Sequence, residues 1–244
     1  MPTDLLISFV AGIFIVAILY SSVGHAGASG YIAVMSLLSL SPLVIKPTAL
    51  ALNILVASIA SVQFIRSGHF SWRLFWPLAL LAVPFALVGG YINLPTHAFT
   101  ALVGVILLYS STRFLFGKQS DQQTREPRLV VALAAGALIG LLSGLTGTGG
   151  GIFLTPLLLF MGWARAKQAA GVSALFILAN SCAGLLGNLS STRALPSYLP
   201  PLLLAAALGG LIGSYLGSRR LADAGIRRFL SVVLFTAGAK LILA

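Results

Sequence analysis

Long apolar runs separated by short polar turns make up most of the chain, and they predict helices that cross a membrane. The runs are continuous instead of alternating over about ten residues, which excludes a membrane β-barrel. In the first half the predicted helices are residues 5–22, 31–40, 47–65, 74–94 and 98–116. In the second half they are residues 129–142, 152–160, 168–187, 198–217 and 229–243. Proline is favourable at the first helical position, so we expect Pro47 to open its helix after a turn at 41–46.

Two of these runs, residues 31–40 and 152–160, are too short to cross, and each follows a glycine-rich interruption. Ten residues of helix rise only about 15 Å, which is half of a hydrocarbon core. The interruptions read GHAGASG from Gly24 and SGLTGTGGG from Ser143. Glycine costs a helix about 1 kcal/mol relative to alanine, so these clusters predict broken helices. Close helix packing through small residues is the alternative explanation, but Pro156 one turn further on favours a break.

The second half repeats the order of these features. Adding 121 to the residue number places Ser22 on Ser143, Gly30 on Gly151 and Lys46 on Lys167. Because the break, the short run, the lysine turn and the next helix recur in order, the chain reads as a duplication. We expect a first membrane repeat at residues 1–116, a cytoplasmic linker at 117–128 and a second repeat at 129–244.

The composition agrees with a membrane protein. Of the 244 residues 58% are hydrophobic and 8% charged, against about 25% charged in a soluble domain. The net charge of +11 lies in the loops, where it reads as a topology signal, so no nucleic acid is expected as a partner. The start of the chain lacks the basic region of a signal peptide and is expected to form the first spanning helix. The single cysteine, Cys182, leaves no disulfide or cysteine metal site to consider.

Charge also predicts the topology. If each break forms a hairpin that leaves the membrane on the side it entered, the two halves are oppositely oriented. With the linker in the cytoplasm, only Lys46, Arg193 and Lys240 of the 15 basic residues then lie outside, in agreement with the positive-inside rule. The expected fold is an all-α polytopic membrane protein of two inverted repeats. Each has about four spanning helices and a glycine-broken hairpin, giving about 8–10 membrane segments with both termini outside the bacterial inner (plasma) membrane.

Broken helices at corresponding positions of inverted repeats indicate a transporter with its site near the membrane midplane. A helix N-terminus carries about half a positive charge and free N–H donors, so two of them favour an anion. Asn53 and Asn180 lie mid-helix, where they either line the site or pair between helices. The candidate substrate-binding residues are Ser22, Gly24, His25, Gly27, Ser29, Gly30, Asn53, Ser143, Thr146, Gly147, Thr148, Gly149, Gly150, Gly151 and Asn180.

The acidic residues argue against a cation. All four carboxylates lie in termini or loops, at Asp4, Asp121, Glu126 and Asp223. None is available in the bundle to bind sodium or relay a proton, and no metal or cofactor is expected. His25 is the one histidine near membrane depth, either as a proton relay or as a hydrogen-bonding residue of a tight turn. For Lys46 and Lys167 we expect snorkelling at helix ends.

The segment SGLTGTGGGIFLTPLL from Ser143 resembles the glycine-rich signature of the TauE/SafE family of sulfite and organosulfonate exporters. SSVGHAGASGY from Ser21 and PTALALN from Pro47 look like one subgroup of it. The resemblance implies that residues 22–30 and 143–151 form the transport centre for a small sulfur anion such as sulfite or sulfoacetate. The first half departs from the glycine pattern at Ala26, Ala28 and Ser29. The partners expected are this anion and the lipid bilayer, with a homodimer left open.

Two other functions compete with anion transport. An intramembrane serine protease needs a serine–histidine pair, but all three histidines precede Ser143 and only His25 is near membrane depth. We therefore expect no enzyme. A passive channel or uniporter for a small oxyanion or carboxylate is the alternative, because the sequence shows no certain coupling residue.

Overall fold

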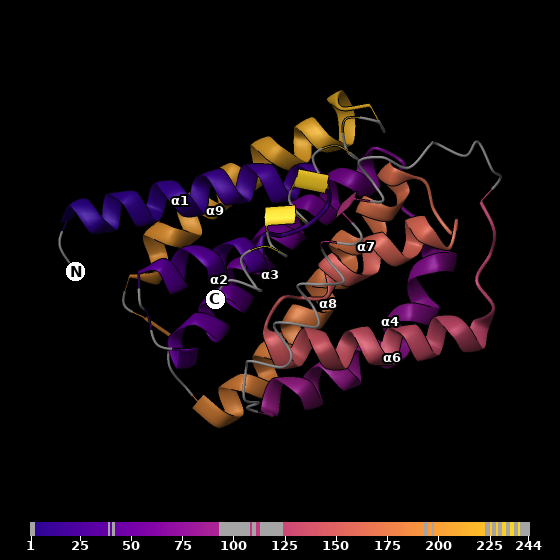
Figure 1. Cartoon of the computed structure of the whole chain (residues 1–244), viewed down its shortest axis with the longest axis horizontal. Helices are drawn as coiled ribbons and strands as arrows, with labels where there is room; N and C mark the ends of the chain where they lie inside the picture. Colours follow the sequence, from indigo (N-terminus) through magenta and orange to yellow (C-terminus); the bar gives the residue numbers. More distant parts are fainter. Residues whose placement is uncertain are drawn as a thin grey trace.

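The computed structural model describes residues 3–38, 40, 42–92, 108, 111–112, 124–192, 195–196 and 198–222, and single positions between 225 and 239. These residues form eight α-helices and one π-helical turn, and they include no strand (Figure 1). The first four helices are α1 Thr3–Ser22, α2 Ala28–Leu37, α3 Pro42–Arg66 and α4 Trp72–Tyr91. The others are α6 Leu129–Thr146, α7 Gly151–Phe160, α8 Ala166–Thr192 and α9 Leu199–Tyr215, which the π-helical turn η1 Leu216–Arg220 extends. The all-helical prediction is confirmed.

Five helical segments of the described chain are long and apolar enough to cross a membrane. They are Val44–Arg66, Trp72–Tyr91, Leu129–Thr146, Ala166–Leu189 and Leu199–Arg220. Leu6–Ser22 and Gly151–Phe160 are shorter apolar helices. A chain with this many apolar spans is a multi-pass membrane protein.

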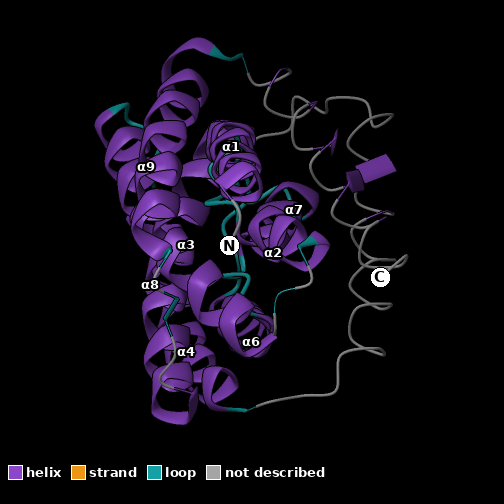
Figure 2. Cartoon of the chain, turned by 90° about the vertical axis from the view of Figure 1, so that its left-hand side faces the viewer, coloured by secondary structure: helices purple, strands orange, loops and turns teal. Residues whose placement is uncertain are grey.

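The helices form two layers (Figure 2). One layer contains α9, α3, α8 and α4 in that order, with α3 and α8 in contact at its centre. On one side of it lie α1, α2, α7 and α6. Helix α1 packs along α9 and helix α6 packs along α4, so the first helix of each half meets the last long helix that the structure describes in the other half (Figure 1).

Glycines set the closeness of these two outer pairs. Three glycines spaced four residues apart on α6 face the α4 backbone, namely Gly136, Gly140 and Gly144. The backbone atoms that a Cβ on these glycines would overlap belong to Leu78, Ala82 and Ala86. In the same way Gly209 and Gly213 of α9 face the α1 backbone at Phe14 and Ile18. Small residues that let two backbones approach are typical of helix packing in membranes.

The helix boundaries differ from the predicted ones at several places. Pro42 takes the first helical position, so the predicted turn at 41–46 is wrong and Pro47 lies inside α3. Proline is favourable at the first helical position, so the helix starts there, and Pro47 removes only one backbone N–H near the helix start. Helix α6 continues to Thr146 instead of ending at residue 142, since Gly144 packs on α4. The basic loop predicted from residue 218 begins as the helical turn η1.

Smaller differences lie at other helix ends. Helix α2 begins at Ala28, three residues before the predicted start, and α4 ends at Tyr91 instead of residue 94. Helix α8 is longer than predicted at both ends, covering Ala166–Thr192. The predicted helices at 98–116 and 229–243 and residues 117–123 of the linker lie almost entirely outside the described residues.

Each short helix runs back toward the start of the helix that precedes it. A Cβ on Gly12 of α1 would meet Val34 of α2, and one on Gly30 would meet Val16, so these two helices are antiparallel. In the second half the backbone N–H of Arg125, before α6, donates to the carbonyl of Gly162, after α7, at 2.9 Å. Each broken stretch is therefore a helical hairpin.

Candidate functional site

The second break is only four residues long, from Gly147 to Gly150. Gly147, Gly149 and Gly150 have φ of 73°, 74° and 83°. This left-handed conformation costs other L-residues about 1–2 kcal/mol each, which explains the glycine cluster. Gly150 precedes the first residue of α7, and no side chain caps that end of the helix. The start of α7 therefore offers backbone N–H groups to a ligand.

The first break, at residues 23–27, is closed by its own hydrogen bonds. The Tyr31 hydroxyl donates to the Ala26 carbonyl at 2.7 Å, and the backbone N–H of His25 donates to Tyr20 at 2.9 Å. Gly24 and Gly27 have φ of 76° and 108°. Gly24 lies against the backbone of Ala170 in α8, so no side chain fits there.

His25 brings the two breaks together. Its side chain is 1% exposed, and its Nε2 lies 2.8 Å from Oγ1 of Thr155 in α7. A Cβ on Gly151, the first residue of α7, would lie 3.3 Å from the His25 ring. The histidine of the first break thus lies against the helix that follows the second break.

Asn53 lies on the other side of the second break. Its Nδ2 is 3.3 Å from the carbonyl of Thr148 and 3.4 Å from Oγ of Ser181, which is in α8. A Cβ on Gly149 would lie 2.8 Å from both Asn53 Nδ2 and Ser181 Oγ. Helices α3 and α8 therefore enclose the glycine break with polar side chains at the centre of the bundle.

Several fully buried polar atoms near these breaks have no hydrogen-bond partner among the residues that the structure describes. They are His25 Nδ1, Asn53 Oδ1, Ser143 Oγ, and both Oδ1 and Nδ2 of Asn180. An unpaired polar group in an apolar interior costs several kcal/mol, and buried groups are normally paired. All four residues were predicted as site residues. Their unpartnered atoms mark the interior as a place for a polar ligand.

Other predicted site residues make contacts within the protein, and these contacts account for the residue type without a ligand. Ser22 and Thr146 donate to carbonyls of their own helices, at Leu19 and Leu142. Thr146 Oγ1 also lies 2.8 Å from the Thr148 hydroxyl. Ser29 pairs with the Tyr20 hydroxyl at 3.2 Å. Gly27 lies against the Tyr31 ring and Gly30 against Val16.

Lys46 is half-buried and lies next to the second break. Its Nζ donates to the carbonyl of Gly90, in the last turn of α4, at 3.0 Å. Its side chain also packs against Gly147, where an added Cβ would lie 3.0 Å from Lys46 Cγ. A cation is favourable at a helix C-terminus. The predicted snorkelling is therefore replaced by a contact with the end of α4.

Sequence reasoning did not find Thr155, Ser181 or Ser173, whose Oγ lies 2.7 Å from Thr155 Oγ1. Ser181 lies in the apolar run next to Asn180, and Thr155 directly precedes Pro156. A polar residue inside an apolar membrane run was the available signal.

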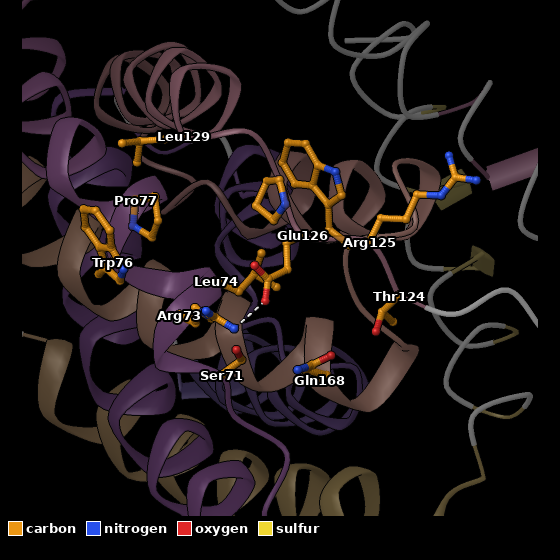
Figure 3. A pocket seen from close by; sticks show the side chains of 12 residues that line it. Ser71, Arg73, Leu74, Trp76, Pro77, Thr124, Arg125, Glu126, Leu129 and Gln168 are labelled. Carbon is orange, nitrogen blue, oxygen red and sulfur yellow. Dashed lines mark hydrogen bonds and ion pairs between the residues drawn. The ribbon is translucent and has the colours of Figure 1, made fainter.

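A separate pocket of about 360 Å³ lies at the ends of α4, α6 and α8, and none of the predicted site residues lines it (Figure 3). Arg73 and Glu126 form an ion pair of 2.6 Å there, with side chains 80% and 70% exposed. Exposed pairs contribute about 0–1 kcal/mol. Among the described residues no three histidine, cysteine or acidic side chains gather as they do at a metal site.

Comparison with known proteins gives a consistent similarity over most of the chain. The sequence model of the family described as "Sulfite exporter TauE/SafE" matches residues 9–241. The "Probable membrane transporter protein y4hK" of Sinorhizobium fredii (strain NBRC 101917 / NGR234) is 45% identical over 234 residues. This alignment covers 94% of the chain and 95% of that relative. No solved structure matches.

Proposed function

The chain belongs to the sulfite exporter TauE/SafE family, and on this premise we propose that it exports a small sulfur-containing anion across the inner membrane. The family is one of membrane transporters and not of enzymes. The substrates proposed are sulfite, sulfoacetate or a related organosulfonate.

The observation that carries this proposal is the set of unpartnered polar atoms beside the uncapped start of α7. An anion at the uncapped start of α7 meets backbone N–H groups there, with the His25 imidazole against Gly151 and the Asn53 amide against Gly149. Backbone N–H groups at a helix start bind oxyanions without any charged side chain. A buried ligand that pairs with these atoms removes the cost of leaving them unsatisfied.

The surroundings favour an anion over a cation. No Asp or Glu is among the buried residues that the structure describes. Glu126, in the linker before α6, is exposed and paired with Arg73. A buried site without a carboxylate offers nothing to neutralise a sodium ion.

We further propose that residues 1–116 and 129–244 are inverted repeats, with the linker 117–128 in the cytoplasm and both termini outside. The pairing of α1 with α9 and of α6 with α4 supports this, because exchanging the halves turns one pair into the other. His25 of the first half meets Thr155 of the second, so the proposed site lies between the repeats. Rocking of one repeat against the other then opens the site to each side in turn.

The test uses the purified protein in liposomes with radiolabelled sulfite. A carrier gives saturable uptake and accelerated exchange when unlabelled sulfite is loaded on the opposite side. A passive channel gives uptake that responds to voltage but not to sulfite on the far side. Sulfoacetate and acetate as competitors then decide between a sulfur anion and a simple carboxylate. Slower loss of sulfite from sulfite-loaded cells when the gene is deleted supports export.

A further inference from the structure

Helix α3 lies against the second break with two polar side chains, Lys46 and Asn53. A Cβ on Gly147 would lie 3.0 Å from Lys46 Cγ, and one on Gly149 would lie 2.8 Å from Asn53 Nδ2. Lys46 and Asn53 are seven residues apart, which is about two helical turns, so both lie on the same face of α3. Lys46 is not among the site residues predicted from the sequence, and it is the one of the two that carries a charge.

The charge of Lys46 is only partly compensated by the residues that the structure describes. Its Nζ donates to the Gly90 carbonyl at 3.0 Å, and a helix C-terminus carries about half a negative charge. An ammonium group has three N–H donors, so this hydrogen bond leaves two of them for another acceptor. No carboxylate in the described part of the chain forms an ion pair with Lys46. The ammonium can therefore still pair with an anion.

Burial separates Lys46 from most other basic residues. Every arginine whose side chain the structure describes is exposed, whereas Lys46 and Lys167 are half-buried. Salt screens a partly buried charge less than an exposed one. A positive charge at Lys46 therefore acts more strongly on a nearby anion than the exposed arginines do.

The duplication of the chain places no equivalent pair of side chains on α8. Adding 121 to the residue number takes Lys46 to Lys167, but it takes Asn53 to the buried Ala174. Lys167 thus lacks the amide that accompanies Lys46 on α3. It is a lysine of the same burial class at the corresponding place, which makes it a matched control.

We propose that Lys46 is a binding residue that supplies the positive charge for the transported anion at the second break. This rests on the proposed function, because it adds a cation to that anion site. Gly147, beside Lys46, and Gly150, at the uncapped start of α7, are three residues apart and so at most about 11 Å from each other. Opposite charges still attract across such a distance where the surroundings are partly buried and the dielectric is low.

The experiment measures sulfite uptake by the full-length protein in liposomes, with thermal unfolding of the same preparation. Lys46→Gln keeps an N–H donor for the Gly90 carbonyl and removes the charge. We expect it to raise KM for sulfite at least about tenfold, as the loss of a charged partner does, with a smaller change in kcat. Lys46→Arg restores the charge and is expected to keep KM within about threefold of the original protein. Lys167→Gln is expected to leave KM and kcat unchanged.

Two results overturn the proposal. One is an unchanged KM in Lys46→Gln, with or without a lower unfolding temperature, because Lys46 then serves only the end of α4. The other is an equal rise of KM in Lys167→Gln, which assigns the effect to the overall charge of the protein. If Lys46→Gln does not fold, Lys46→Met, which keeps the apolar contact with Gly147, is measured in its place by the same criteria.

A separate measurement distinguishes this proposal from the proposed function. Binding of sodium sulfite and of sodium acetate to the purified protein is measured by calorimetry. Acetate binding that is lost in Lys46→Gln, in a protein that does not bind sulfite, supports the role of Lys46 and contradicts the sulfur anion as substrate. Sulfite binding that is the same in Lys46→Gln and the original protein contradicts the role of Lys46 and leaves the proposed function standing.

Discussion

Gly149 and Asn53 fit together without room for a side chain between them: a Cβ added to Gly149 would lie 2.8 Å from Asn53 Nδ2. Gly149 belongs to the second half of the chain and Asn53 to the first, so this contact joins the glycine break to the long helix α3. Three of the predictions below test whether the centre of the bundle serves binding or only packing.

Gly149→Ala is expected to abolish sulfite transport. The new methyl group meets Asn53 and Ser181, and the φ of 74° adds about 1–2 kcal/mol of strain. Gly162→Ala is the matched control, because Gly162 has φ of 66° but nothing within 4 Å of an added Cβ. Both variants bear the backbone strain, and only Gly149→Ala crowds the site. Liposome flux and thermal unfolding measure the two effects, and full transport by Gly149→Ala would contradict the site.

Asn180→Leu is expected to stabilise the protein while removing transport. Neither polar atom of its buried amide has a partner in the described part of the chain, so leucine removes an unpaired group of similar size. Such a replacement is neutral or stabilising, by about 1–3 kcal/mol. A structural amide that pairs helices would give the reverse, a loss of stability. Unfolding in detergent and sulfite flux on the same preparation distinguish them, with Arg73→Ala at the exposed ion pair as a variant that changes neither by much.

The breaks could be predicted from the sequence because their cause is local. Gly147, Gly149 and Gly150 adopt a backbone conformation that glycine accepts without strain. The cluster of glycines can be read directly from the sequence. The polar partners of the site could not be predicted in the same way. Helices α7 and α8 have no distinct apolar face, so periodicity does not tell which side of either helix points inward. Thr155 and Ser181 belong to the candidate site because they lie within hydrogen-bond distance of His25 and Asn53, which are more than 100 residues away in the sequence.

The boundary errors have a similar cause. A glycine in a membrane helix either breaks it or lets a neighbour approach, and Gly144 does the second because Ala86 of α4 lies against it. The sequence around Gly144 has five glycines in eight positions. It does not tell which of them break the helix and which let a neighbouring helix approach. Only the packing of α6 on α4 does so.

Gly140→Ala is expected to weaken the packing of α6 on α4. An added methyl would overlap the backbone of Ala82, and a backbone cannot move aside as a side chain can. Separating the helices is expected to cost about 1–3 kcal/mol, as overpacking does elsewhere. Gly184→Ala in α8 serves as the control, because its nearest neighbour would be 3.6 Å away and alanine favours helix by about 1 kcal/mol. Equal unfolding midpoints for the two variants would show that the glycine seam does not hold the pair together.

His25→Gln is expected to slow sulfite transport while leaving its response to a pH gradient intact. The reason is that His25 is already paired in a buried hydrogen bond with Thr155, and hydrogensulfite can carry the proton itself. A permanently ionised sulfonate has no such proton, so its flux is expected to ignore the gradient in both proteins. Measuring the flux of sulfite and of the sulfonate with and without the pH gradient tells whether His25 or the substrate carries the proton. Loss of the pH response for sulfite in His25→Gln alone would make His25 the proton relay.

The last prediction concerns orientation, on which the proposed inverted repeat depends. In a Cys182→Ser background, single cysteines at Pro95 and Ser191 are expected to react with an impermeant maleimide added to intact cells. Cysteines at Ser120 and Ala224 are expected to react only after the membrane is opened, because the flanking arginines and lysines hold these loops in the cytoplasm. Ser120 and Ala224 come from different halves, so they share a side only if the halves have opposite orientation. Labelling of one and protection of the other in intact cells would mean that the halves are parallel. The start of α7 and the first break would then not face one common site from opposite directions.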